Sequence, residues 1–153
     1  MEQLRPDLYE ILSSFLDHVK ELGWKVYTCT DFNILSCVAY YMIEVPNTEK
    51  ACIYYRVWQK TINPATVERD FFIMREMLYA DICDYLILIY SPGHNEPFSF
   101  LFHERPKDLD KLVIFDVDTQ YSRYSISFYS DGITSFVADE FRKHLSSIGY
   151  KRW

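Results

Sequence analysis

Two aspartates separated by one residue, Asp116 and Asp118, are the side chains whose type and spacing most directly suggest chemistry. They follow the apolar residues 112–115, Leu-Val-Ile-Phe, which predict a buried strand. Alternate residues of a strand point to the same face, so two such carboxylates at a strand end can hold Mg²⁺. A strand that turns into a polar loop explains the same residues. Asp116 and Asp118 are therefore candidate metal ligands, and the alternative is that they only mark the point where the strand turns into a loop.

Residues 112–119 resemble the first motif of haloacid-dehalogenase-type phosphatases. That family has one more residue between its second aspartate and its threonine, and it needs a long chain after the motif. Here 34 residues follow Thr119. The Asp-x-Asp motif of glycosyltransferases likewise requires a nucleotide-binding domain. Both departures favour the structural interpretation of the two aspartates.

The histidines, serines and glycines match no common catalytic motif. Spacings of the HxH or HExxH type are absent from the four histidines, His18, His94, His103 and His144. His103 beside Glu104 could serve as a general base, although a solvated loop is the simpler interpretation. Residues 91–93, Ser-Pro-Gly, lack the Gly-x-Ser-x-Gly turn of serine hydrolases. With four glycines in the chain, a glycine-rich phosphate-binding loop is also missing.

Cysteine usage and hydropathy bear on the compartment. No CxxC pair occurs among the four cysteines, Cys29, Cys37, Cys52 and Cys83. Each lies in or beside an apolar run, which predicts buried free thiols in a reducing compartment. Residues 1–7 have no hydrophobic signal region, and the longest apolar run, residues 85–90, is too short to span a bilayer. We therefore expect a cytoplasmic protein without a membrane segment.

Composition and charge narrow the class of protein. A chain of 153 residues with 49% apolar side chains predicts a single domain, residues 1–153, with a substantial core. The net charge is −6 and no segment is strongly basic, which does not support binding to nucleic acid. Aromatic residues make up 18% of the chain. They predict either a β-rich core or an exposed surface that binds a partner.

The periodicity of apolar residues predicts an α+β fold with a mixed central sheet and helices packed on it. Helices are expected at residues 6–22, 64–83 and 134–148. Strands are expected at residues 25–30, 37–45, 51–58, 85–90, 98–102, 112–117 and 124–129. The turn at residues 46–49 makes its two flanking strands an antiparallel hairpin. Residues 85–90 lack polar alternation, which predicts a central strand covered on both faces.

The predicted order of helix, three strands, helix and strand over residues 8–90 resembles the core of the restriction-endonuclease-like, or PD-(D/E)xK, nucleases. Residues 53–61, followed by a helix and residues 85–90, are similar to the corresponding part of Mrr-type enzymes. The resemblance implies an acidic residue at the start of the second strand. It also implies an acid and a lysine, two residues apart, at the end of the third. Such carboxylates hold Mg²⁺ and the lysine stabilises developing charge.

The chain departs from that pattern at the residues that matter for catalysis. Tyr54 and Arg56 occupy the third-strand positions, and the nearest acids on the second strand are Asp31 and Glu44. Tyr54 is a poor ligand for Mg²⁺, and Arg56 supplies charge without a compact ammonium group. The same element order resembles the C-terminal domain of tRNA-splicing endonucleases, whose catalytic histidine is replaced here by Lys50.

Two main hypotheses follow. The first is a non-catalytic nuclease-like domain without a cofactor, which binds protein partners and forms a homodimer. The second is a divergent nuclease that uses Mg²⁺, with the candidate residues Glu10, Asp31, Glu44, Arg56 and Lys60. A small-molecule enzyme built on Asp116 and Asp118 is a third. Carboxylates clustered within reach of one metal would favour an enzyme, and dispersed ones a binding domain.

The expected dimer surface lies in the last third of the chain. The strand at residues 124–129 is expected to be half exposed, with one face bearing Tyr beyond the core-facing one. Tyr and Arg are enriched in protein interfaces. Further interface candidates are Arg123, Arg142, Tyr150, Arg152 and Trp153.

Overall fold

The computed structural model describes residues 7–28, 39–57, 83–91, 111–128 and 135–152. Within these ranges, seven strands form one sheet in chain order, and two helices pack on it. The strands are β1 (Lys25–Thr28), β2 (Ala39–Val45), β3 (Glu49–Val57), β4 (Tyr85–Ser91), β5 (Leu112–Asp118), β6 (Arg123–Phe128) and β7 (Lys151–Arg152). The helices are α1 (Leu8–Glu21) and α4 (Phe136–Ser147). The predicted α+β class is confirmed.

The sheet is mixed. Strands β1, β2 and β3 form an antiparallel unit, and β3, β4 and β5 are parallel to one another. Strand β6 is antiparallel to β5, and β7 is parallel to β6. The interior position predicted for residues 85–90 is confirmed, because β4 lies between β3 and β5. The helix expected at residues 64–83 and the strand expected at 98–102 lie outside the described residues, apart from Cys83.

Both helices begin at a capping side chain and end before a glycine. The Asp7 carboxylate accepts a hydrogen bond from the Glu10 N–H at 2.8 Å, and the Ser135 hydroxyl accepts one from the Ala138 N–H at 3.1 Å. Gly23 and Gly149 follow the two helices with φ of 87° and 92°, a conformation that glycine adopts without strain. Both helices end within one residue of the expected position, and both start two residues later than expected because Asp7 and Ser135 are their caps.

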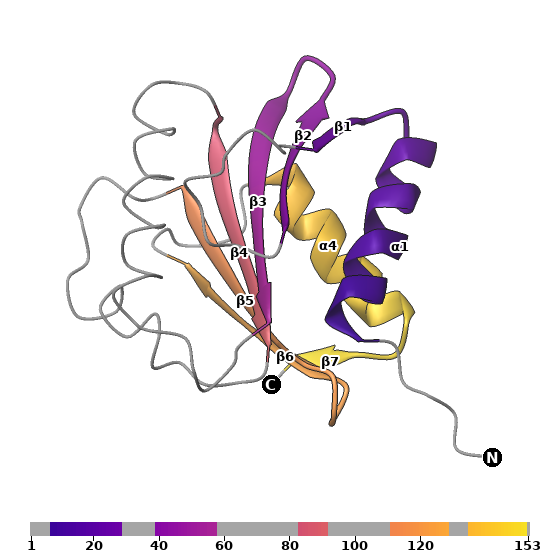
Figure 1. The fold of residues 1–153 in the computed structure, drawn as a ribbon. Coiled ribbons are helices and arrows are strands. Elements are labelled where there is room, and N and C mark those ends of the chain that lie inside the picture. Colours follow the sequence, from indigo (N-terminus) through magenta and orange to yellow (C-terminus); the bar gives the residue numbers. More distant parts are fainter. Residues whose placement is uncertain (1–6, 29–38, 58–82, 92–110, 129–134, 153) are drawn as a thin grey trace.

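Helices α1 and α4 cover the same face of the sheet (Figure 1). On that face Phe141 packs edge-on against Phe15 and Phe115, with ring centroids 5.0 and 4.8 Å apart. Strand alternation places Tyr54, Leu88 and Ile114 on the opposite face, and these are buried as well. The central strands are therefore covered on both faces, as their lack of polar alternation predicts.

The C-terminal segment differs from the sequence-based expectation. Residues 151–152 form β7, which pairs with Arg123 and Tyr124 of β6. Tyr150 is 5% exposed and belongs to the core, so its ring is not available to a partner, contrary to our expectation. Tyr124 is also buried, and Arg142 is bound to Asp139 at 2.9 Å within α4. Trp153 lies outside the described residues.

Candidate functional site

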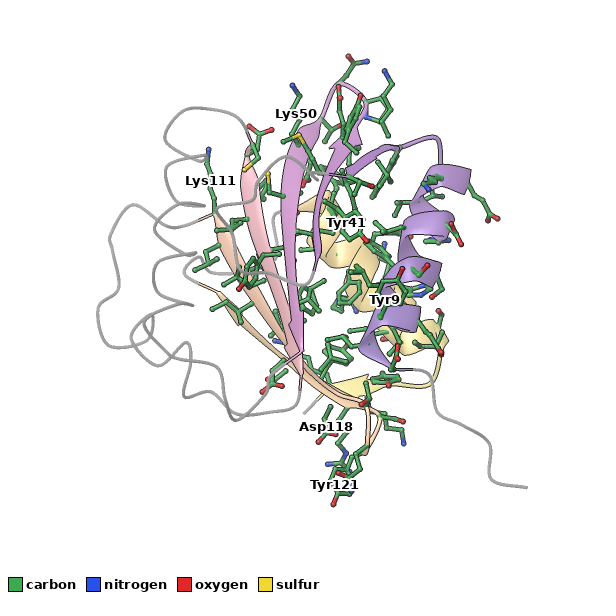
Figure 2. The ribbon with its side chains drawn as sticks, viewed as in Figure 1. Tyr9, Tyr41, Lys50, Lys111, Asp118 and Tyr121 are labelled. Carbon is green, nitrogen blue, oxygen red and sulfur yellow. The ribbon has the colours of Figure 1, made fainter. Side chains whose placement is uncertain are left out.

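The two ends of the sheet carry different polar residues. Figure 2 places Lys50, where β3 begins, at one end and Asp118, where β5 ends, at the other. We call the first the hairpin end, which consists of residues 44–50 together with Cys83 and Asp84. The second is the carboxyl end, where the parallel strands β3, β4 and β5 finish.

At the carboxyl end, four residues form one row across four strands. Arg56 of β3 is in register with Tyr90 of β4, Tyr90 with Asp116 of β5, and Asp116 with Ser125 of β6. We call these four residues the carboxyl-end row. Ligands of sheets with parallel strands bind characteristically at the carboxyl ends of those strands. The row thus places Arg56, a nuclease candidate, two strands away from Asp116, a candidate from an unrelated motif, and this register is not revealed by the sequence alone.

The two aspartates of the Asp-x-Asp motif have different environments. Asp116 is 6% exposed and lies within the sheet. The Asp118 carboxylate accepts hydrogen bonds from the backbone N–H groups of Gln120 and Tyr121 at 2.9 and 3.2 Å. These bonds close the turn between β5 and β6, a common use of aspartate at a strand end. Asp118 therefore has a structural role, and Asp116 is the one of the two whose position suits a site.

The candidate nuclease residues are not brought together. Glu44 is in register with Lys25 and Lys50 at the hairpin end, whereas Arg56 lies at the carboxyl end. Glu10 is exposed in the first turn of α1, and the last turn of that helix leads to Lys25. The helix rises about 18 Å over the twelve steps from Glu10 to its C-cap, Leu22. Asp31 and Lys60 lie outside the described residues.

Tyr54 fills the position at which the resemblance implies a carboxylate. The register places it opposite Tyr40, near the start of β2. Its side chain is 1% exposed and is among the largest that are fully buried. A buried phenol is a neutral, poor ligand for Mg²⁺, which takes carboxylate, carbonyl and water oxygens.

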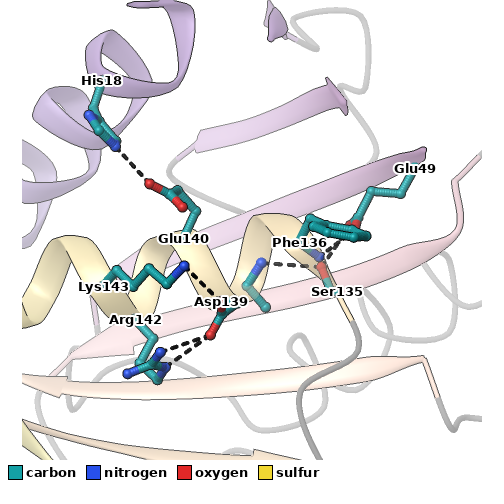
Figure 3. A network of polar contacts seen from close by, with 9 residues as sticks. His18, Glu49, Ser135, Phe136, Asp139, Glu140, Arg142 and Lys143 are labelled. Atoms are coloured by element: carbon teal, nitrogen blue, oxygen red, sulfur yellow. Dashed lines mark hydrogen bonds and ion pairs between the residues drawn. The ribbon is translucent and has the colours of Figure 1, made fainter. Parts of the chain in front are cut away.

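At the hairpin end, Glu49 is a buried carboxylate with a structural role. It is 5% exposed and accepts a hydrogen bond from the Ser135 hydroxyl at 2.7 Å. It also accepts one from the Phe136 N–H (Figure 3). Burial raises the pKa of Glu49, and the hydrogen bonds from Ser135 and Phe136 oppose that effect. Glu49 thus ties the start of β3 to the first turn of α4.

A pocket of about 340 Å³ opens at the hairpin end. Two hydrogen bonds join Asp84 to Lys50 in its lining: the Asp84 N–H donates to the Lys50 carbonyl at 2.7 Å, and the Asp84 carboxylate accepts from the Lys50 N–H at 2.9 Å. The lining residues include Glu44, Glu49, Lys50, Cys83 and Asp84. Three of these residues are acidic, one is basic and one is a cysteine.

A polar cluster lies between α1 and α4. His18 Nε2 contacts the Glu140 carboxylate at 2.9 Å (Figure 3). His144 Nε2 lies 2.8 Å from the Ser14 hydroxyl. The two imidazole rings stack, with centroids 5.8 Å apart. Burial lowers the pKa of His144, and the neighbouring His18 lowers it further.

Ser14 and His144 do not form a nucleophile and a base. The Ser14 hydroxyl donates its single proton to the Ile11 carbonyl at 2.9 Å, so its oxygen accepts from His144 Nε2. A nucleophilic serine needs the opposite direction, with the proton passing to the histidine. Sequence analysis missed this cluster because its members lie on two distant helices. The signal it could have used is the i, i+4 spacing of Ser14 with His18 and of Glu140 with His144.

In the part of the chain that the structure describes, no group of three or more His, Cys, Asp or Glu side chains is arranged to hold a metal ion. Neither α1 nor α4 has the length and apolar character that a membrane span requires.

Comparison of the chain with protein-family models, curated proteins and solved structures found no match.

Proposed function

We propose that this chain is a non-catalytic, nuclease-like domain that acts through protein contacts, including contacts with a second copy of itself. The observation that carries the proposal is the burial of Tyr54 at the position where the resembled nucleases need a carboxylate. A metal-dependent nuclease requires that ligand to activate water and to stabilise the leaving oxygen. Without it, the fold is retained and the chemistry is lost.

The arrangement of the strands supports the same proposal. An antiparallel unit of three strands followed by a parallel fourth strand is compatible with the core order of the resembled nucleases. Glu10 and Glu44, two of the candidate nuclease acids, lie apart. Three carboxylate residues do line the hairpin-end pocket, but among the described residues no such group is arranged to hold a metal ion, which supports a binding domain more than a metal-dependent enzyme.

Exposed aromatic side chains among the described residues support a binding role. Tyr9 is exposed in the first turn of α1, Tyr27 on β1, Tyr121 in the turn before β6, and Phe136 at the start of α4. Aromatic rings exposed in this way are enriched in protein interfaces. With Tyr150 buried, these four rings join the rest of the proposed C-terminal surface as candidate contacts.

Metal binding and nuclease activity provide the first test. We expect titration calorimetry with Mn²⁺ to show no tight, stoichiometric heat, and we expect plasmid DNA to remain uncut. Asp17→Ala, an exposed acid on α1, is the matched control for Asp31→Ala. Nicking by the unaltered chain that Asp31→Ala abolishes and Asp17→Ala preserves would overturn the proposal.

Self-association provides the second test. Sedimentation equilibrium at micromolar concentrations is expected to give the mass of a dimer, because closed twofold pairing is the commonest assembly of identical chains. Tyr27→Asp and Tyr121→Asp each place a charge on one exposed ring, and we expect one of them to shift the equilibrium towards monomer. A monomeric mass at every concentration would remove the self-association part of the proposal.

A divergent metal-dependent nuclease acting on DNA or RNA is the second candidate. One observation favours it: the carboxyl-end row places Arg56 and Asp116 in one register across parallel strands. In this alternative Asp116 would be the metal ligand and Arg56 the cation. Nicking that Asp116→Asn abolishes and Asp118→Asn leaves intact would support the enzyme.

A further inference from the structure

We propose that two copies of the chain associate through a basic edge of the sheet in one copy and an acidic stripe of α1 in the other. The basic edge consists of Arg123, Lys151 and Arg152. The acidic stripe consists of Glu10, Asp17 and Glu21. This inference rests on the proposed self-association and names the two surfaces that meet in it.

Strand pairing gathers the basic edge from two segments of the chain. Arg123 of β6 is in register with Lys151 of β7, and Arg152 follows Lys151 along β7. The Lys151 N–H donates to the Ser122 carbonyl at 3.0 Å, which holds β7 against the start of β6. All three basic side chains are exposed. Like charges opposite each other on neighbouring strands are destabilising, so an anionic group that lies against this edge stabilises it.

The cations of the basic edge form no ion pair with a described residue, unlike other cations of the same region. Arg142 and Lys143 of α4 both pair with Asp139, at 2.9 and 3.3 Å. Asp118 is in register with Arg123, but its carboxylate accepts the two backbone hydrogen bonds that close the turn between β5 and β6. The basic edge is therefore available to acids of another molecule.

The acidic stripe follows one face of α1. Glu10, Asp17 and Glu21 are spaced by seven and four positions, which places them on one side of the helix. All three are exposed, and none of them forms an ion pair with a described residue. Asp17 and Glu21 lie one turn apart, where like charges destabilise a helix. Lys20 is the only lysine or arginine of α1, so the stripe remains acidic.

The two surfaces have complementary charges, which makes a second copy of the chain the partner that fits both. The net charge of the chain is −6, so two copies repel each other over most of their surfaces. Their association therefore needs opposite charges at the point of contact, and the basic edge and the acidic stripe supply them. In a twofold dimer the contact occurs twice, because each copy offers its edge to the stripe of the other.

An exposed tyrosine lies beside each of the two surfaces (Figure 2). Tyr121 is 66% exposed in the turn that leads to Arg123, and Tyr9 is 54% exposed and directly precedes Glu10 on α1. Tyrosine is enriched in protein interfaces, and the face of its ring attracts a lysine or arginine side chain. In the proposed contact, Tyr9 lies where the basic edge of the other copy approaches, so its ring adds to the attraction of the acids.

Sedimentation equilibrium of the unaltered chain in low and high salt tests the contact without any substitution. Salt screens the attraction between opposite charges, so the dissociation constant of the dimer is expected to rise about tenfold between about 0.05 and about 0.5 M NaCl. Repulsion between two chains of net charge −6 would alone give the opposite trend. A dissociation constant that stays the same or falls as salt is added would overturn the inference.

Charge reversal of the two surfaces identifies them. One variant carries Arg123→Glu and Lys151→Glu, and the other carries Glu10→Lys and Asp17→Lys. Each variant alone should be monomeric, because like charges then face each other in both halves of the twofold contact. An equal mixture of the two should form dimers, because each variant then meets the opposite charge on the other. Native mass spectrometry distinguishes this mixed dimer, since the two variants differ in mass.

The matched control carries Lys25→Glu and Lys111→Glu, which makes the same change of charge at two exposed lysines outside the basic edge. It should dimerise as the unaltered chain does, and circular dichroism shows whether each variant is folded. Loss of the dimer in this control, or a folded mixture that stays monomeric, would overturn the inference. Dimers of both charge-reversed variants would overturn it and leave self-association standing, whereas a monomeric unaltered chain would remove both.

Discussion

Glu49 and Asp116 are both buried carboxylates of the same sheet, yet the contacts around them differ. Glu49 stands at the hairpin end, where β3 begins, and its oxygens accept bonds that start α4. Asp116 stands at the carboxyl end, in register with Tyr90 and Ser125 on the neighbouring strands. The first acid joins two elements of the fold. The second lies where parallel strands end, which is the usual place for a ligand.

The comparison teaches that burial of an acid is not in itself a sign of chemistry. A buried carboxylate is costly unless it is bound, and a helix N-terminus is one of the environments that binds it. The burial of Glu49 is explained by the hydrogen bonds that its carboxylate accepts from Ser135 and Phe136, so no function is needed to explain it. The position of Asp116 in a row of polar residues, and not its burial, makes it the better candidate for a site.

The largest effect is expected from Glu49→Ala. This change leaves the Ser135 hydroxyl and the Phe136 N–H without their acceptor, and it should reduce the free energy of unfolding by about 2–3 kcal/mol. Urea unfolding followed by circular dichroism measures the change. Glu44→Ala, a less buried acid on the same hairpin, is the matched control and should cost less than about 0.5 kcal/mol. Equal losses of unfolding free energy in the two variants would contradict the structural role that we assign to Glu49.

A smaller effect on the free energy of unfolding is expected from His144. This residue lies in the last turn of α4, far from the first turn that Glu49 binds. Its pKa in the folded protein is lowered by burial and by His18, so the unfolded chain binds the proton more strongly. The stabilising contribution is therefore present above about pH 6.5 and is lost as the pH falls through the lowered pKa. The free energy of unfolding should decrease between pH 7.5 and 5.5, and His144→Gln should flatten that part of the profile. An unchanged slope in the variant would contradict the role of His144.

The smallest effect is expected from Asp116→Asn. The replacement keeps the volume of the side chain and one acceptor oxygen, so the free energy of unfolding should change by less than about 0.5 kcal/mol. Glu49→Gln, measured in the same way, should cost more, because Glu49 accepts from two donors that define a helix start. A large loss in Asp116→Asn would place Asp116 with Glu49 among the structural acids.

The sequence predicts most of the fold because its local signals agree with the tertiary structure. Helix ends can be predicted from neighbouring residues, because a capping residue stabilises the turn next to its own position. The residues at the helix ends here are Asp7, Gly23, Ser135 and Gly149. The hairpin between β2 and β3 and the interior position of β4 follow from turn residues and from unbroken apolar runs. The short strand β7 was missed because two residues carry no periodicity.

The site is less predictable because its members are joined only by strand pairing. Arg56 and Asp116 lie 60 positions apart in the chain. They share a row only because β4 pairs with both of their strands. The contact of Glu49 with Ser135 spans 86 positions of the sequence, and that of His18 with Glu140 spans 122. Residue spacing describes one element at a time, so it identified Asp116 and Arg56 as candidates for two different chemistries.

The strand order has a consequence for how the protein is made. In the described part of the sheet, each strand pairs with the strands that precede and follow it in the chain. As the polypeptide leaves the ribosome, every new strand meets an edge that has already formed, and no strand must be inserted between two earlier ones. The growing sheet thus offers one open edge at a time to the emerging chain. Helix α4 and β7 follow the other described elements in the chain, so the acceptor on Glu49 receives its donors only after the 86 further positions to Ser135 have been synthesised.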